Sequence, residues 1–135
     1  MNGYMADTNI LIRAIRQPHH PLVGILCAHI GKDLYLSPVT WAELVYGAYR
    51  SADPRHNLET AQKLVGSIPI LPFDTAAAVH AGQIMADLAR AETPIGDRDV
   101  LIAAHARSLG LTMVTHNVRE FSRVAGLHIE DWIAE

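Results

Sequence analysis

Four acidic side chains stand where a small α/β protein could use them for chemistry. Asp7 directly follows the short apolar run 4–6, Glu43 lies early in a predicted helix, and Asp97 and Asp99 open another predicted helix. Carboxylate oxygens are the ligands that Mg²⁺ and Mn²⁺ prefer, and an ion held among them can bridge to phosphate oxygens and lower the pKa of a bound water. If these acids converge, they form a metal site that can cut a polyanion.

Each acid also has a purely structural interpretation. Aspartate often caps a helix that follows a strand, which suits Asp7. Glu43 and Thr40 match the Thr-x-x-Glu pattern of a capping box. Acids in the first turn of a helix, such as Asp97 and Asp99, interact favourably with the helix dipole. The functional interpretation therefore depends on the convergence of several acids and not on any one of them.

Short apolar runs that alternate with helical patterns must position these residues. The predicted strands are 4–6, 34–36, 68–73, 112–115 and 127–129. Alternation with helices indicates βαβ units, and therefore an α/β fold with a mostly parallel sheet of about five strands that helices cover on both faces. Sites in such folds lie beyond the carboxyl ends of the strands, where Asp7, His116 and Asn117 stand. The turn 93–96 would bring the helix that begins at Asp97 to the same edge.

Length and composition limit the remaining possibilities. The 135 residues, 50% of them hydrophobic, suit a single domain, 1–135, that can bury a core without disulfides. The formal net charge of −3 excludes nucleic-acid binding by bulk positive charge. Cys27 lies in an apolar run and is expected to be buried. Since the chain has neither an apolar signal core nor a stretch that could span a bilayer, we expect a cytoplasmic protein without membrane contact.

The chain resembles the PIN-domain ribonucleases of the VapC toxin type. The segments that carry the resemblance, in the family's order and spacing, are 4–10 (YMADTNI), 40–47 (TWAELVYG), 93–106 (TPIGDRDVLIAAHA), 115–121 (THNVREF) and 126–132 (GLHIEDW). The resemblance implies a three-layer α/β/α domain and an endoribonuclease that depends on Mg²⁺ or Mn²⁺. It also implies that Asp7, Glu43 and Asp99 are the catalytic acids and hold the metal.

The resemblance assigns supporting roles to further polar residues. Thr8, Thr115 and Asn117 match positions that hold water, metal or a carboxylate. Asp97 is an added acid beside the metal ligands, and Glu120 could supply a fourth carboxylate through water. Many family members have an acid where Asn117 stands, so we expect only three acids to contact the metal here.

Partners and RNA contacts are implied in the same way. Arg13, Arg16, Arg98 and Arg119 lie near the motif segments and are candidate contacts for RNA phosphates, although a solvated helix surface would also hold them. The resemblance implies a toxin whose cognate VapB-type antitoxin covers the active site, a homodimer, and a structured RNA substrate, often transfer RNA. His116 departs from the asparagine that is more common at its position.

Two other functions stay open on the sequence. A small phosphatase or receiver-like protein could use Asp7 as an aspartyl-phosphate nucleophile, but such proteins usually have an acid two residues later and a late lysine. Here Asn9 stands at that position and no lysine follows Lys63. A non-catalytic binding module would use the acids only as helix caps. Asp7→Asn separates a cap from a metal ligand, because only the ligand needs the charge.

Overall fold

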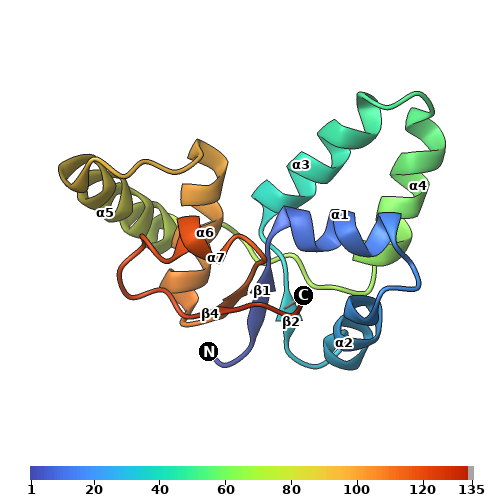
Figure 1. The fold of residues 1–135 in the computed structure, drawn as a ribbon, viewed down its shortest axis with the longest axis horizontal. Helices are drawn as coiled ribbons and strands as arrows, with labels where there is room; N and C mark the ends of the chain where they lie inside the picture. The colour runs from blue at the N-terminus through green and yellow to red at the C-terminus, as the bar shows by residue number, and fades with distance from the viewer. Residues whose placement is uncertain (134–135) are drawn as a thin grey trace.

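A four-stranded parallel sheet forms the centre of the computed structural model, which describes residues 1–133 (Figure 1). The strands are β1 (Tyr4–Ala6), β2 (Leu34–Tyr35), β3 (Thr112–Val114) and β4 (Ile129–Glu130), in the order β2-β1-β3-β4. Met5 of β1 pairs with Tyr35 on one side and with Met113 on the other. The residue that follows β1 therefore lies in the middle of the carboxyl edge. The last two residues of the predicted domain, 134 and 135, lie outside the described residues.

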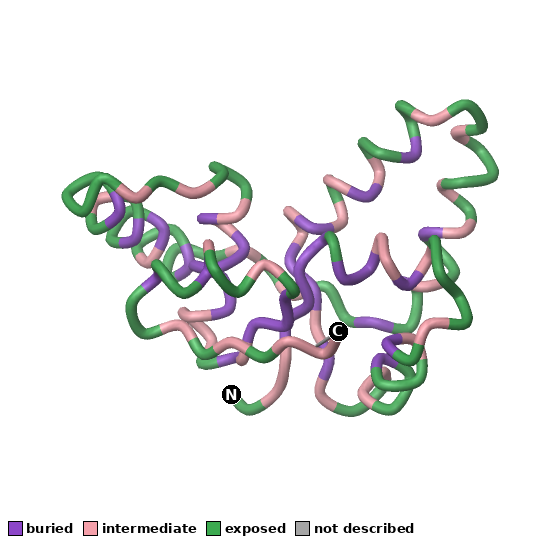
Figure 2. The backbone as a smooth tube through the Cα atoms, in the orientation of Figure 1, coloured by how far each residue is buried: buried purple, intermediate pink, exposed green. Residues whose placement is uncertain are grey.

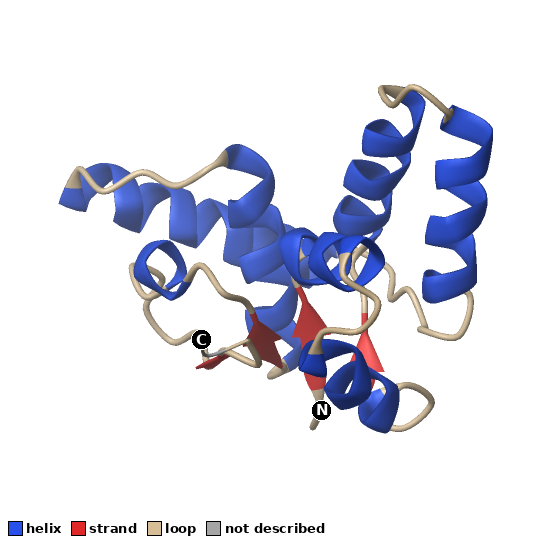
Figure 3. Ribbon diagram, turned by 45° about the vertical axis from the view of Figure 1, so that its right-hand side comes forward, coloured by secondary structure: helices blue, strands red, loops and turns tan. Residues whose placement is uncertain are grey.

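Seven helices within residues 1–133 surround this sheet (Figure 3). They are α1 (Thr8–Arg16), α2 (Pro21–His29), α3 (Pro38–Tyr49), α4 (Pro54–Val65), α5 (Thr75–Ala91), α6 (Asp97–Leu109) and α7 (Val118–Phe121). Proline in the first turn starts α2, α3 and α4, and aspartate side chains cap α1, α4 and α5. None of the helices formed by these residues is long and apolar enough to cross a membrane.

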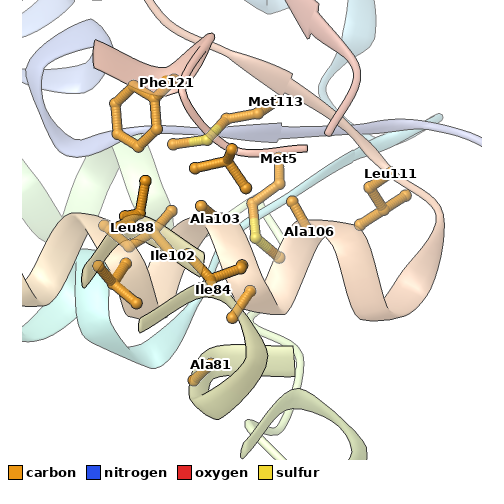
Figure 4. Close-up of a cluster of buried hydrophobic side chains, with 13 residues drawn as sticks. Met5, Ala81, Ile84, Leu88, Ile102, Ala103, Ala106, Leu111, Met113 and Phe121 are labelled. Atoms are coloured by element: carbon orange, nitrogen blue, oxygen red, sulfur yellow. The ribbon is translucent and has the colours of Figure 1, made fainter. Parts of the chain in front are cut away.

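Two apolar clusters fill the spaces on the two sides of the sheet. Met5 and Met113 pack with α5, α6 and Phe121 (Figure 4), whereas Ala6 and Val114 pack with residues of α1 to α4. Successive residues of a strand point to opposite faces, so β1, β2 and β3 each supply both clusters. The two central strands, β1 and β3, are mostly buried, as Figure 2 shows, which is typical of parallel strands covered on both faces, whereas the edge strand β4 is not. The predicted α/β fold is confirmed.

One predicted strand is almost absent. Residues 68–73 pair with β2 only through an isolated parallel bridge between Leu36 and Ile70. Pro69 and Pro72 explain the difference, because proline has no backbone N–H to donate to a neighbouring strand. The sheet of the described chain therefore has four strands and not about five.

The predicted burial of Cys27 is wrong, because its side chain is exposed. Helix α2 turns Leu22 and Leu26 toward the core. Each residue of an α-helix is rotated by about 100° from the one before it, so the residue after Leu26 points away from the core. The apolar run 22–30 did not indicate which side of the helix is covered.

Candidate active site

Asp7 follows β1 and is almost fully buried, at 3% exposure. Its Oδ1 accepts a hydrogen bond from the Ile10 backbone N–H at 3.0 Å, and its Oδ2 accepts one from Thr115 Oγ1 at 2.5 Å. Burial raises the pKa of Asp7 above its ordinary value of 3.8, because loss of hydration outweighs these hydrogen bonds. Asp7 therefore caps α1, as predicted, and at the same time places a perturbed carboxyl group at the edge of the sheet.

Glu43 reaches the same edge from the second turn of α3. Thr8 Oγ1 donates to Glu43 Oε1 at 2.6 Å, and Arg98 Nε donates to Glu43 Oε2 at 3.0 Å. The capping box with Thr40 is wrong, because Ser37 caps α3 through the Val39 backbone N–H. The carboxylate of Glu43 is instead held by side chains of α1 and α6.

Asp99 lies in the first turn of α6, as predicted. Burial and then the negative charges of Glu43, Asp7 and Glu120 raise the pKa of Asp99 from 3.8 to about 6. Gly96 leaves room for this side chain, since a Cβ atom there would stand 3.1 Å from Asp99 Oδ2.

Asp7, Glu43 and Asp99 line one recess of about 260 Å³. The other lining residues are Thr8, Asn9, Ile12, Tyr46, Gly47 and Arg98. The structure therefore brings the three predicted acids together, although they come from separate elements and are far apart in the sequence. Asp97 is exposed and does not line this recess.

A chain of hydrogen bonds connects Asp7 to the polar residues after β3. Thr115 Oγ1 accepts from the Asn117 backbone N–H at 2.9 Å, and Asn117 Nδ2 donates to Glu120 Oε2 at 2.9 Å. Thr115 is fully buried, whereas Asn117 and Glu120 are half-buried at the start of α7. The predicted supporting residues of this segment thus form one network with Asp7.

The four candidate arginines lie in different surroundings. Arg98 lines the carboxylate recess and pairs with Glu43. Arg13 and Arg16 line a neighbouring recess of about 600 Å³ with His116 and Asn117, among others. Arg119 is exposed on α7 and lines neither recess.

The carboxylate recess fits a hard divalent cation by its charge and by its donor atoms. Asp7 and Asp99 have raised pKa values because they are buried beside other carboxylates, and a cation would relieve that repulsion. In the part of the chain that the structure describes, no three acidic, histidine or cysteine side chains stand close enough together to hold a metal ion by themselves. Water molecules would have to complete the coordination, as is usual for Mg²⁺.

Sequence reasoning missed Tyr46 as a residue of the recess. Tyr46 follows Glu43 by one helical turn, and residues three apart on a helix are neighbours on its surface. That spacing was the available signal, since any side chain one turn from a site acid is a candidate for the rim of the site.

The chain is similar to known proteins over nearly its whole length. A family model described as "PIN domain" matches residues 4–127. The chain is 46% identical over 132 residues to the "tRNA(fMet)-specific endonuclease VapC" of Shigella flexneri, covering 98% of this chain and 99% of that relative. It is 41% identical, with the same coverages, to the protein of that name from Salmonella typhimurium.

Two solved structures have the same fold. A chain of the DNA-bound VapBC structure from Salmonella typhimurium superposes with a TM-score of 0.93 at 41% identity, covering 98% of this chain and 99% of that one. A chain of VapBC-1 from nontypeable Haemophilus influenzae superposes with a TM-score of 0.86 at 30% identity, covering 98% of each.

Proposed function

This chain belongs to the PIN-domain family and, within it, to the VapC toxin ribonucleases, and from that membership we propose that its carboxylate recess hydrolyses RNA with the help of a divalent metal ion. The observation that carries the proposal is the convergence of Asp7, Glu43 and Asp99 in one recess. We propose structured RNA as the substrate, and initiator transfer RNA first, because two relatives of similar length are named for it.

We assign the holding of Mg²⁺ or Mn²⁺ to Asp7, Glu43 and Asp99. When bound, the ion would polarise the scissile phosphate and lower the pKa of a water ligand. Ile10 and Thr115 fix the carboxyl group of Asp7, and Thr8 fixes that of Glu43. These hydrogen bonds orient the acids before substrate arrives, which reduces the reorganisation that the reaction needs. Because water attacks and the 2′-hydroxyl does not, the products carry a 5′-phosphate and a 3′-hydroxyl.

The arginine-lined recess supports a path for the RNA backbone. Asn9 and Ile12 line both this recess and the carboxylate recess, so the two adjoin. We propose that phosphates beside the scissile bond contact Arg13 and Arg16 here, and Arg98 on the other side of the carboxylates. A negatively charged chain needs such local positive groups to bind RNA. Arg119, exposed on α7, is a further candidate contact.

An apolar groove supports an antitoxin as the partner. It has a volume of about 200 Å³, and its lining residues come from α1, α3 and α4. They are Ile12, Ile15, Arg16, Glu43, Leu44, Gly47, Ala48, Ser51, Asn57 and Ala61. Because Glu43 stands at this groove, an apolar segment of a VapB-type antitoxin bound there would cover one of the site acids. Similar chains solved as VapBC support this partner. A cytoplasmic homodimer of single-domain chains, implied by the resemblance, belongs to the same proposal.

The family membership and the sequence argue against the aspartyl-phosphate alternative. Asn9 stands where such proteins usually have a second acid, and no lysine follows Lys63. Membership of a ribonuclease family also argues against a non-catalytic binding module.

Cleavage of initiator transfer RNA by the purified, antitoxin-free protein tests the proposal. Reactions contain Mn²⁺, Mg²⁺ or a chelator, with Asp7→Asn as the inactive control. We expect discrete fragments with 5′-phosphate ends that require the metal and that the variant does not produce. Fragments that end in a 2′,3′-cyclic phosphate, or cleavage in the presence of chelator, would overturn the mechanism.

A further inference from the structure

Tyr46 presents an exposed aromatic ring at the rim of the carboxylate recess. The residue is 55% exposed and lines that recess together with Arg98. It also lines an adjoining recess of about 350 Å³ with Ala42, Glu43 and Arg98. We infer that the Tyr46 ring is a stacking platform for an RNA base next to the scissile phosphate. This inference rests on the proposed ribonuclease function and specifies how the site holds its substrate.

The ring of Tyr46 contributes little to the folded core. Leu44 and Ala48 supply the buried side of α3, whereas Tyr46 points toward solvent beside the site. An aromatic ring is a large apolar surface, and leaving it in water forgoes the free energy that burial would give. Exposure alone does not identify a binding residue, since Tyr49 is more exposed; what distinguishes Tyr46 is that its exposed ring lines the recess of the acids.

Arg50 restrains the ring in its exposed position. Its Nη1 donates to Tyr46 Oη at 2.9 Å, and its guanidinium carbon lies 5.6 Å from the ring centroid. A side chain that is already held in place loses less conformational entropy when it binds a ligand. The guanidinium group also brings a positive charge to the ring, which suits a base attached to a phosphate backbone.

The position of Tyr46 relative to the acids fits a base next to the reacting phosphate. Glu43 and Tyr46 line the same two recesses, one helical turn apart on α3. A phosphodiester at the carboxylates has a nucleoside on each side, and among the described residues that line the carboxylate recess only Tyr46 is aromatic. Stacking on an aromatic ring tolerates every base, so Tyr46 would position the strand and leave sequence choice to other contacts.

Tyr49 provides a matched control on the same helix. It is 66% exposed and lines neither recess, so Tyr49→Ala removes an exposed tyrosine away from the site. Tyr46→Ala removes the proposed platform, and Tyr46→Phe keeps the ring but loses the hydroxyl that Arg50 contacts.

The first test measures binding and cleavage separately. Fluorescence anisotropy of labelled initiator transfer RNA in chelator gives the metal-free affinity, and cleavage with Mn²⁺ gives kcat/KM. We expect Tyr46→Ala to weaken both by about tenfold, Tyr46→Phe to recover most of the loss, and Tyr49→Ala to match the wild type. The inference would be overturned if Tyr46→Ala bound and cleaved the RNA as well as the wild type does. It would also be overturned if Tyr49→Ala lost as much affinity and kcat/KM as Tyr46→Ala.

The second test identifies the stacked base. After the cleaved bond is mapped, two substrates are made, each lacking the base on one side of that bond. For one of these substrates we expect the kcat/KM of the wild type to be about tenfold lower than for intact transfer RNA. The kcat/KM of Tyr46→Ala should be nearly the same for that substrate and for intact transfer RNA, because the ring that would contact the missing base is already absent. If, for both substrates, the loss of kcat/KM from removing the base and the loss from Tyr46→Ala multiply, the ring and the base act independently and the stacking is refuted. No cleavage by the wild type would overturn the proposed function instead, and the metal-free affinities would still decide the role of Tyr46.

Discussion

Thr115 Oγ1 donates a hydrogen bond to Asp7 Oδ2 across 2.5 Å, joining two residues that are 108 positions apart in the chain. The bond connects the carboxyl ends of the neighbouring strands β1 and β3 in a buried part of the sheet edge. A donor to the ionised carboxylate opposes the effect of burial on the pKa of Asp7. Thr115 therefore helps to keep a buried acid charged.

Removal of the Thr115 hydroxyl should weaken both the site and the fold. Thr115→Val leaves a buried carboxylate oxygen without this donor and also removes the acceptor of the Asn117 N–H. We expect the free energy of unfolding to fall by about 1–3 kcal/mol and cleavage by roughly 10- to 100-fold. Urea unfolding and a pH–rate profile measure this, with the acid limb moving to higher pH. Thr115→Ser keeps the hydroxyl and should resemble the wild type; a wild-type profile for Thr115→Val would contradict the positioning role.

Two aspartate caps allow the charge of Asp7 to be tested apart from its capping. Asp74 caps α5 by accepting from the Ala77 N–H at 3.0 Å, and it lies outside the carboxylate recess. Asparagine caps helices about as well as aspartate, so both Asp7→Asn and Asp74→Asn should change the free energy of unfolding by less than about 1 kcal/mol. We expect only Asp7→Asn to lose cleavage, by at least about 100-fold. Equal activity of the two variants would mean that the charge of Asp7 is not used.

The raised pKa of Asp99 predicts opposite pH dependences for metal-free stability and for metal binding. Its pKa rises from 3.8 to about 6 on folding, so its contribution to stability is complete below the lower value and is lost as pH rises through about 6. Mn²⁺ competes with the proton and should therefore raise Tm more at about pH 7.5 than at about pH 5. Thermal melts across this range, with and without Mn²⁺, measure both effects. Asp99→Asn should reduce both; a Mn²⁺ shift that is equal at the two pH values would contradict the prediction.

The sequence predicted those parts of the structure that depend on local pattern. Strands 4–6 and 112–115 were recognised because buried parallel strands are short continuous apolar runs, and the edge rule then placed Asp7 near Asn117. The run 68–73 has a similar apolar character, but its prolines limit it to one bridge. Helix α7 was not predicted, since four residues are too few for a helical period to appear.

Contacts between helices were beyond local pattern. Thr40 and Glu43 match a capping box, yet Ser37 caps α3 and Glu43 pairs with Thr8 and Arg98. The meeting of α1, α3 and α6 depends on how the whole core packs, so the edge rule and the turn 93–96 could predict the convergence of their acids only as a condition, and the family resemblance then indicated which acids take part. Tyr46 was missed because periodicity identifies the buried side of a helix, whereas a binding side chain stands on its exposed side.

Ile15 offers a way to separate antitoxin binding from RNA cleavage. It lines the apolar groove beside α1, α3 and α4 but not the carboxylate recess. A charge in an apolar pocket must be desolvated when a partner covers it, so we expect Ile15→Arg to weaken binding of the cognate VapB-type antitoxin by roughly 10- to 100-fold. Cleavage by the free protein should be retained, because the substitution lies outside the recess that holds the acids.

Calorimetric titration measures the affinity of each variant for the antitoxin. The same preparations are then tested for cleavage of initiator transfer RNA. Val79→Arg is the matched control, since Val79 lies on α5, is 55% exposed and does not line the groove. Thermal melts establish that each variant is folded before the two activities are compared. If the groove holds the antitoxin, Ile15→Arg cuts RNA in the presence of antitoxin concentrations that silence Val79→Arg. Unchanged antitoxin affinity for folded Ile15→Arg would mean that the antitoxin covers Glu43 from a different direction.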